Sequence, residues 1–119
     1  MDSHQSVQAD TFAELLDAWR GEEVKIARLI TTDYVGHMLH LSIGDRTGPM
    51  YTGWIEEFRL KNPGTEFSVL DQSLAGDRLW TRLEARRADG AVANGMNVSR
   101  FVGDRIAEEW AIWSAWWSD

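Results

Sequence analysis

Two side chains in the sequence have the chemistry of a general acid or base near neutral pH. His37 is the first, because an imidazole has its ordinary pKa close to physiological pH. Tyr34 precedes it by three residues and would bind a ligand beside it. The alternative is a structural role, in which His37 stands at the end of a helix and bonds to a backbone carbonyl.

Glu109 is the second catalytic candidate, because the strand pattern described below directs it inward beside Arg100. A buried carboxylate either pairs with a neighbouring cation or has its pKa raised by desolvation. The first outcome makes Glu109 half of a structural ion pair. The second makes it a general acid or base, and the sequence leaves both open.

A metal site is the weaker use of this region. Asp33, His37 and His40 would share one face of a helix, and two imidazoles with a carboxylate suit a divalent cation. Such local spacing is common by chance, and the one other histidine is His4, near the start of the chain. The sequence therefore predicts no metal ligand set.

Aromatic and polar side chains at helical and strand spacing predict a pocket for an organic molecule, with a purely structural core as the alternative. Aromatic residues would form its walls, and amides would hydrogen-bond a ligand carbonyl or hydroxyl. The predicted ligand-binding residues are Tyr34, Tyr51, Trp54, Phe58, Gln72, Asn94, Met96 and Trp113. No phosphate-binding glycine loop or Ser-His-Asp order occurs, so no nucleotide cofactor and no acyl-enzyme is expected.

Three helices are predicted in the first half of the chain. Residues 1–8 are polar and aperiodic, which predicts a flexible tail, and a single domain is expected over residues 9–119. A capping box at Thr11 opens the first helix, which ends at Gly21. A short second helix would begin near Glu22 and run to about Ile30. The third begins at Pro49 and ends before Asn62-Pro63-Gly64.

Four strands follow, because the apolar period changes from 3.6 to 2. They cover residues 66–75, 78–87, 93–102 and 105–113, with turns rich in glycine and aspartate between them. Alternation places Gln72, Asn94, Met96, Glu109 and Trp113 on the face under the helices. The outer face would carry Trp80, Phe101 and Trp110 and pair with a second copy of the chain. Helices first and a strand meander second indicate an α+β fold.

The amino-acid composition limits the kinds of molecule that the protein is expected to bind and the compartment in which it is expected. The 119 residues carry a net charge of −7, which disfavours nucleic acid and anionic membranes. The absence of cysteine fits a reducing compartment, and the start of the chain lacks the apolar run of a signal peptide, so a cytoplasmic protein is predicted. Four of the seven tryptophans lie in the last ten residues, at positions 110, 113, 116 and 117. One alternative function is therefore a subunit that binds another protein through this end.

The order of these motifs resembles the SnoaL-like polyketide cyclase family of the nuclear-transport-factor-2-like superfamily. The resemblance rests on Asp33-Tyr34-Val35-Gly36-His37, on Gly48 before a helix that ends at Asn62-Pro63, on Gly76-Asp77-Arg78-Leu79 and, most of all, on SRFVGDRIAEEW at positions 99–110. It covers nearly the whole chain. It implies a cone-shaped, curved antiparallel sheet that encloses a pocket with three N-terminal helices, and commonly a homodimer.

The same resemblance implies the function. It indicates a cofactor-independent enzyme of secondary metabolism that acts on a hydrophobic polycyclic or aromatic molecule, as a cyclase, isomerase or hydratase. The cyclase-like members carry a catalytic Asp shortly after the tryptophan of the last strand, whereas this chain has Ala111 and Ser114 there. The alternative expectation is therefore a non-catalytic small-molecule-binding or accessory homodimer.

Overall fold

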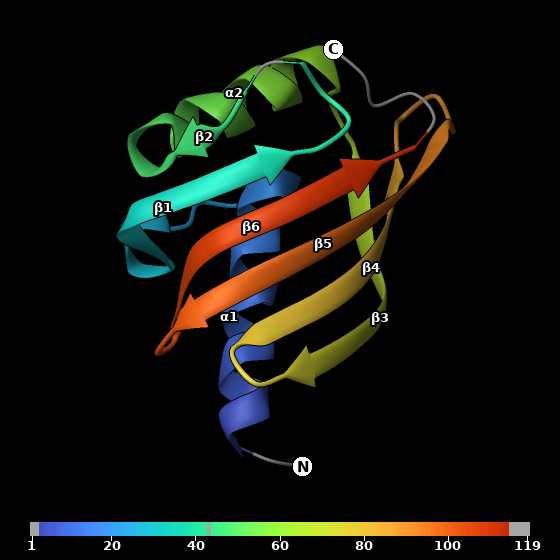
Figure 1. Cartoon of the computed structure of the whole chain (residues 1–119). Helices are drawn as coiled ribbons and strands as arrows, with labels where there is room; N and C mark the ends of the chain where they lie inside the picture. The colour runs from blue at the N-terminus through green and yellow to red at the C-terminus, as the bar shows by residue number, and fades with distance from the viewer. Residues whose placement is uncertain (1–2, 43, 115–119) are drawn as a thin grey trace.

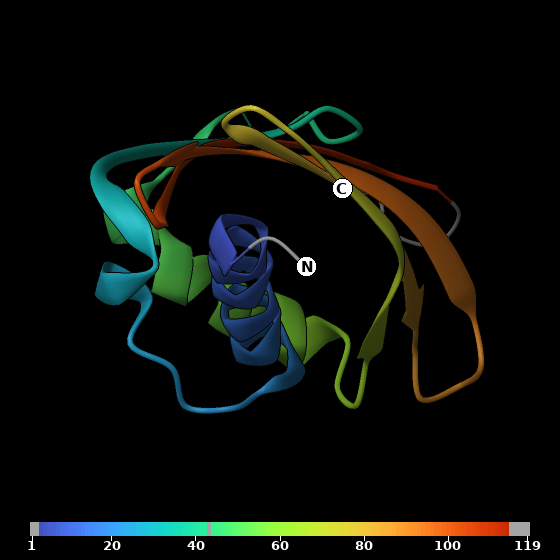
Figure 2. The same ribbon diagram turned by 90° about the horizontal axis from the view of Figure 1, so that it is seen from below.

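Six strands form one curved sheet in the computed structural model of the chain, which describes residues 3–42 and 44–114. They are β1 (Ile30–Met38), β2 (Arg46–Thr47), β3 (Glu66–Ala75), β4 (Arg78–Arg86), β5 (Val92–Val102) and β6 (Arg105–Trp113), in the spatial order β2-β1-β6-β5-β4-β3. Strands β1 and β6 run parallel and the other neighbours antiparallel. The sheet bends without closing on itself (Figures 1 and 2).

Two α-helices cover the concave face. Helix α1 (Ser3–Arg20) lies inside the curve of the sheet, and α2 (Tyr51–Lys61) crosses near one end (Figure 2). Helix α1 buries apolar side chains at helical spacing, among them Phe12, Leu15, Leu16 and Trp19. It ends at Gly21, whose φ of 102° is the left-handed conformation that glycine adopts most easily. The curved α+β architecture is therefore confirmed.

The N-terminal half differs from the sequence prediction in two places. Helix α1 begins at Ser3, so residues 3–8 are helical rather than a loose tail, and the Thr11 hydroxyl bonds to Val7 O within the helix at 3.1 Å instead of capping its start. The predicted second helix is one 3-10 turn, Ile26–Arg28. The segment after it forms β1, because its β-branched residues pack well in a sheet and pair with β6.

The inner face of the sheet is as predicted on β4 and β6 but is shifted by one residue on β5. Leu79, Leu83 and Trp113 are buried, whereas Met96 is 43% exposed and Asn94 is exposed. A bulge on β6, where Arg100 pairs with Glu108 but the next residue of β5 pairs with Ile106, moves the register by one. Alternation therefore turns Gly95, Asn97, Ser99 and Phe101 inward. Phe101 is only 3% exposed, so its predicted place on the outer face is wrong.

A glycine lets Trp113 lie flat against the inner face. Gly95 pairs with Trp113 across β5 and β6, and a Cβ at Gly95 would come within 2.5 Å of the indole ring. The indole therefore occupies the space that any other residue would need. Trp116 and Trp117, which contribute to the predicted tryptophan-rich end, lie outside the described residues.

No helix within residues 3–42 and 44–114 is long and apolar enough to cross a membrane.

Candidate functional site

A small cavity lies between the two helices and the concave face of the sheet. About 60 Å³ is open inside it, which is room for a few water molecules and well below the roughly 300–1,000 Å³ of pockets that hold drug-sized ligands. Its walls are mostly aromatic and aliphatic. The lining residues are Phe12, Leu15, Leu16, Trp19, Tyr34, Gly36, His37, Met38, Tyr51, Trp54, Phe67, Leu83, Asn97, Glu109, Ala111 and Trp113.

Glu109 is the buried carboxylate of this cavity, and neutral groups hold it. The Tyr34 hydroxyl donates to its Oε1 at 2.8 Å, while Asn97 Nδ2 and Ser99 Oγ donate to its Oε2 at 3.0 and 2.9 Å. These three donors lie on β1 and β5, the two neighbours of β6 in the sheet. The predicted inward position of Arg100 beside Glu109 is wrong, because Arg100 faces outward and bonds to Glu108, which excludes the ion-pair alternative.

Burial raises the pKa of Glu109, and the hydrogen bonds from Tyr34, Asn97 and Ser99 oppose that rise without cancelling it. Desolvation dominates because no cation pairs with this carboxylate among residues 3–42 and 44–114. A glutamate with a raised pKa exchanges its proton closer to neutral pH than an exposed one does. Glu109 therefore has the electrostatic surroundings of a general acid or base.

A chain of hydrogen bonds leads from α1 to Glu109. Trp19 Nε1 donates to the Tyr51 hydroxyl at 2.9 Å, and Tyr51 in turn lies beside Tyr34, with 5.3 Å between the two ring centroids. Burial, together with the nearby charge of Glu109, raises the pKa of both tyrosines well above the ordinary value. Both phenols therefore stay protonated at neutral pH and act as donors rather than as bases.

The absence of a side chain at Gly36 leaves room for the Tyr34 hydroxyl. A Cβ at Gly36 would lie 2.7 Å from the Tyr34 hydroxyl oxygen, so a larger residue would push that hydroxyl away from Glu109. Gly36 and Glu109 are paired residues on the adjacent parallel strands β1 and β6. The tyrosine thus bends over the glycine to reach the carboxylate on the next strand.

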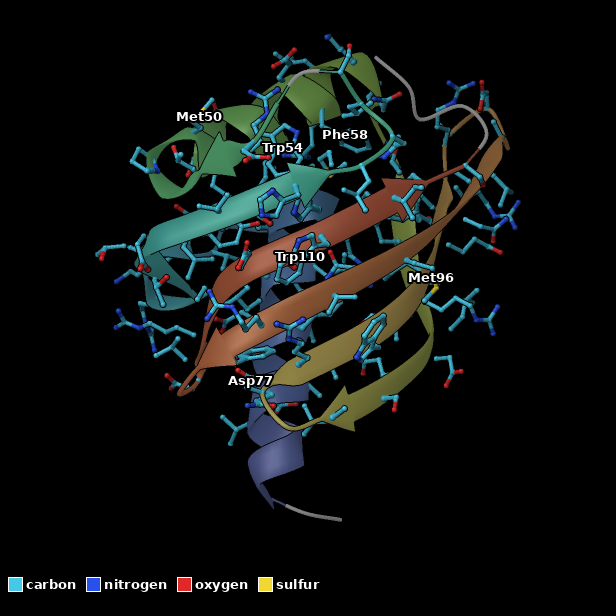
Figure 3. The ribbon with its side chains drawn as sticks, viewed as in Figure 1. Met50, Trp54, Phe58, Asp77, Met96 and Trp110 are labelled. Carbon is cyan, nitrogen blue, oxygen red and sulfur yellow. The ribbon has the colours of Figure 1, made fainter. Side chains whose placement is uncertain are left out.

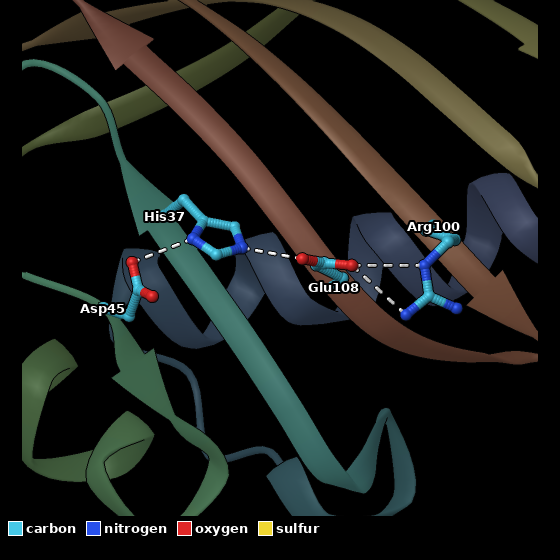
Figure 4. Close-up of polar contacts among 4 residues, drawn as sticks. All are labelled: His37, Asp45, Arg100 and Glu108. Carbon is cyan, nitrogen blue, oxygen red and sulfur yellow. Dashed lines mark hydrogen bonds and ion pairs between the residues drawn. The ribbon is translucent and has the colours of Figure 1, made fainter.

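His37, the other predicted catalytic residue, borders the cavity, but its ring nitrogens bond elsewhere. Nδ1 contacts Asp45 Oδ1 at 2.8 Å and Nε2 contacts Glu108 Oε2 at 2.7 Å, in a row with Arg100 on the face of the sheet away from α1 (Figure 4). Partial burial lowers the pKa of His37, but the bonds to both carboxylates outweigh this effect and raise it. The sheet therefore separates the His37 imidazole from Glu109.

The predicted ligand-binding residues divide into three groups. Tyr34, Tyr51, Trp54 and Trp113 line the cavity. Phe58 packs behind that wall against Trp19, and Gln72 bonds to Thr81 Oγ1 on the inner face at 3.2 Å. Asn94 and Met96 border a separate hollow with Arg82 and Ile112, and Figure 3 shows Met96 on the side of the sheet away from the helices. Their prediction as cavity residues is wrong, because of the shift on β5.

Sequence reasoning missed Asn97 and Ser99, the two donors from β5. The signal that could have found them is the polar pair itself, Asn97 and Ser99, at alternate positions on a strand face that otherwise carries Ala93, Gly95 and Phe101. As for a metal, no group of three or more His, Asp or Glu within the described ranges 3–42 and 44–114 is placed to bind one. Of the suggested ligands, Asp33 bonds to Thr31 and His37 to Asp45, so they do not converge.

Solved structures provide the comparison with known proteins. IdmH from Streptomyces antibioticus, named as a candidate polyketide cyclase, is 24% identical and superposes with a TM-score of 0.77 over 90% of this chain and 91% of its own. An NTF2-like protein of unknown function from Mesorhizobium loti is 19% identical, with a TM-score of 0.71 and 97% of both chains covered. The chain has the nuclear-transport-factor-2-like fold. This confirms, at the level of the fold, the resemblance found in the sequence.

A third neighbour with the same fold bears the family name directly. It is a candidate SnoaL-like polyketide cyclase from Shewanella putrefaciens, with 9% identity and a TM-score of 0.71 over 95% of this chain and 80% of its own. No family model matches the chain, and no curated protein matches its sequence. Within this fold, the cavity under the curved sheet is therefore the place to look for a function.

Proposed function

We propose that the chain is an enzyme of the cyclase and isomerase type, which moves a proton on a small hydrophobic molecule with Glu109 as general acid and base. The observation that carries the proposal is a buried carboxylate in an aromatic cavity, held by Tyr34, Asn97 and Ser99 and by no cation among the described ranges 3–42 and 44–114. Polycyclic or aromatic substrates, a role in secondary metabolism and a cytoplasmic location remain predictions from the sequence.

The hydrogen-bond geometry leaves Glu109 one acceptor position for a substrate. A carboxylate offers about four lone-pair sites, two on each oxygen. Asn97 and Ser99 donate to Oε2, while Tyr34 alone among the described residues donates to Oε1. The second lone pair of Oε1 is therefore the one that accepts a proton from substrate carbon. Returning that proton to another carbon needs no electron transfer and no cofactor.

Glu109 can take the place of the carboxylate that is absent after Trp110. Ala111 occupies the usual place, and it lines the same cavity as Glu109 because the two residues alternate on one face of β6. Moving the carboxylate by two residues keeps it on the inner face and shifts it along the strand by about 6 to 7 Å. The same proton chemistry then acts on a different part of the substrate.

Hydrogen exchange tests this proposal without knowledge of the natural substrate. 2-Indanone, a small aromatic ketone, loses a proton next to its carbonyl when it forms an enolate, the step shared by aldol cyclisation and isomerisation. We expect the protein to accelerate the exchange of these hydrogens with D₂O, followed by proton NMR. Equal exchange rates with and without protein would argue for the non-catalytic alternative.

That alternative is a small-molecule-binding or accessory protein, and one observation favours it. The cavity of about 60 Å³ is smaller than an aromatic ketone, so any such ligand must displace wall side chains to enter. A binding protein with this cavity would bind ligands but leave the exchange rate of their hydrogens unchanged.

The chain should also form a homodimer through the outer face of the sheet. Trp80, Met96 and Ile112 are each more than 40% exposed on neighbouring strands, and a monomer rarely exposes such a patch. Light scattering at tens of micromolar should give twice the chain mass, and Trp80→Glu should halve it. Leu60→Glu, on the exposed surface of α2, is the matched control that should stay dimeric. A wild-type monomer would contradict this prediction.

A further inference from the structure

Arg46 shares a row of the sheet with the buried carboxylate. On β2 it pairs with Gly36 of β1, and Gly36 pairs in turn with Glu109 of β6. Residues paired across neighbouring strands project from the same face. Arg46 therefore lies on the concave side, two strands from Glu109, or about 10 Å away at the usual strand spacing. The residue between them has no side chain.

The guanidinium of Arg46 has no polar partner within residues 3–42 and 44–114. Its Nε is buried and makes no hydrogen bond, and its one described contact is with the ring of Trp54, whose centroid lies 5.7 Å from Arg46 Cζ. Glu57 senses the charge of Arg46 but is exposed and already pairs with Lys61 at 2.9 Å. Burying the Nε–H without a partner costs free energy, which an acceptor on a ligand would offset.

Arg46 lies beside Trp54, on the most accessible side of the cavity. The walls from α1 and from the sheet are buried, whereas Trp54 of α2 is only partly buried and lies on the side of α2 that faces β1 (Figure 3). Of the lining residues, only His37 is comparably accessible, and its ring bonds to Asp45 and Glu108 on the outer face. A ligand that enters past Trp54 meets Arg46 first.

We propose that Arg46 binds a carboxylate on the substrate, so that the molecules accepted by the cavity are small aromatic or alicyclic carboxylic acids. A guanidinium offers two parallel donors that match a carboxylate, and the cation–π contact with Trp54 holds the guanidinium beside the cavity wall. The Tyr34 ring covers Gly36, so the apolar body extends along that ring towards Glu109. This inference gives a substrate class to the proposed function, and its test is a binding measurement that requires no turnover.

The test compares benzoate with its uncharged analogue benzamide at neutral pH by isothermal titration calorimetry. Wild-type protein should bind benzoate at least about tenfold more tightly than benzamide, since a hydrogen bond to a charged group is commonly worth that factor. Arg46→Gln should bind both equally. Arg105→Gln, which removes one exposed positive charge at the far end of the sheet, should keep the preference.

Two further variants distinguish carboxylate binding by Arg46 from proton transfer by Glu109 and from a simple effect of charge. Glu109→Gln should keep the benzoate preference even though it stops proton transfer, so failure of the catalytic proposal leaves a different signature. Arg46→Lys keeps the charge without the paired donors and should lose most of the preference for benzoate. This variant replaces Arg46→Gln in the test if Arg46→Gln folds poorly. Equal binding of the two probes by wild type, an undiminished preference in Arg46→Gln, or no saturable benzoate binding up to about 10 mM would overturn the inference.

Discussion

Replacing Glu109 by Gln should lower the rate of 2-indanone hydrogen exchange by about 10²- to 10⁴-fold, the usual contribution of general acid–base catalysis. Glutamine keeps the shape of the side chain but cannot accept the proton. Since Tyr34, Asn97 and Ser99 remain in place, the cavity walls should change little. Circular dichroism of the variant should therefore match that of the wild type.

The neighbouring residue is a matched control. Glu108→Gln makes the same chemical change one position earlier on β6, where the side chain points outward and bonds to His37 and Arg100. This variant should exchange hydrogens at a rate close to that of the wild type, and so should His37→Gln. Near-normal exchange by Glu109→Gln, or a large loss in Glu108→Gln or His37→Gln, would contradict proton transfer by Glu109.

Trp19→Ala should lower the free energy of unfolding by about 3–5 kcal/mol, as truncations of large buried aromatic residues do. Trp19 is 8% exposed and makes edge contacts with Tyr51, Trp54, Phe58 and Phe67, with ring centroids 4.9 to 6.5 Å apart. It also holds the Tyr51 hydroxyl through Nε1. Urea denaturation followed by circular dichroism gives the measurement.

Two further variants show which interactions of Trp19 contribute to the free energy of unfolding. Trp19→Phe keeps an aromatic ring but loses the bond to Tyr51, so it should cost less than Trp19→Ala. Leu60→Ala removes a side chain that is 84% exposed on α2 and should change stability by less than about 0.5 kcal/mol. A loss below about 1 kcal/mol in Trp19→Ala would mean that the aromatic cluster does not hold the helices on the sheet.

Much of the fold was predictable because local patterns agreed with it. The apolar stripes of α1 and α2 have the helical period, and the glycine turn at 76–77 fixed the pairing of β3 with β4 near that turn. Strand β1 was not predictable in the same way. Its main partner, β6, lies about 75 residues further along the chain, and a parallel pairing leaves no hairpin turn in the sequence.

The unpredicted strand β1 also explains why the His37 ring does not share a site with Tyr34. Residues three apart share a face in a helix but lie on opposite faces of a strand. Tyr34 is 2% exposed inside the cavity, whereas His37 bonds to Glu108 outside. Tyr34 and Glu109 therefore both line the cavity, as predicted, whereas the His37 ring, predicted for the same site, bonds on the opposite face of the sheet.

A bulge on β6 accounts for the error on β5. The extra residue on β6, Ala107, cannot be seen from alternation, because Ile106 and Ala107 are both buried. The resulting shift on β5 replaced the predicted neighbour Arg100 by Ser99 and Asn97. Glu109 is therefore held by neutral donors instead of Arg100, and its proposed role as general acid or base rests on this property.

The protonation of Glu109 is the most direct test of this account. Carbon-13 NMR of the glutamate side-chain carboxyls, recorded against pH, gives the pKa of each, and the Glu109→Gln and Glu108→Gln proteins assign the two signals. Burial should raise the pKa of Glu109 above the ordinary glutamate value of about 4.3, whereas His37 and Arg100 should hold the pKa of Glu108 below it. A Glu109 carboxyl that titrates at or below the ordinary value would contradict the account.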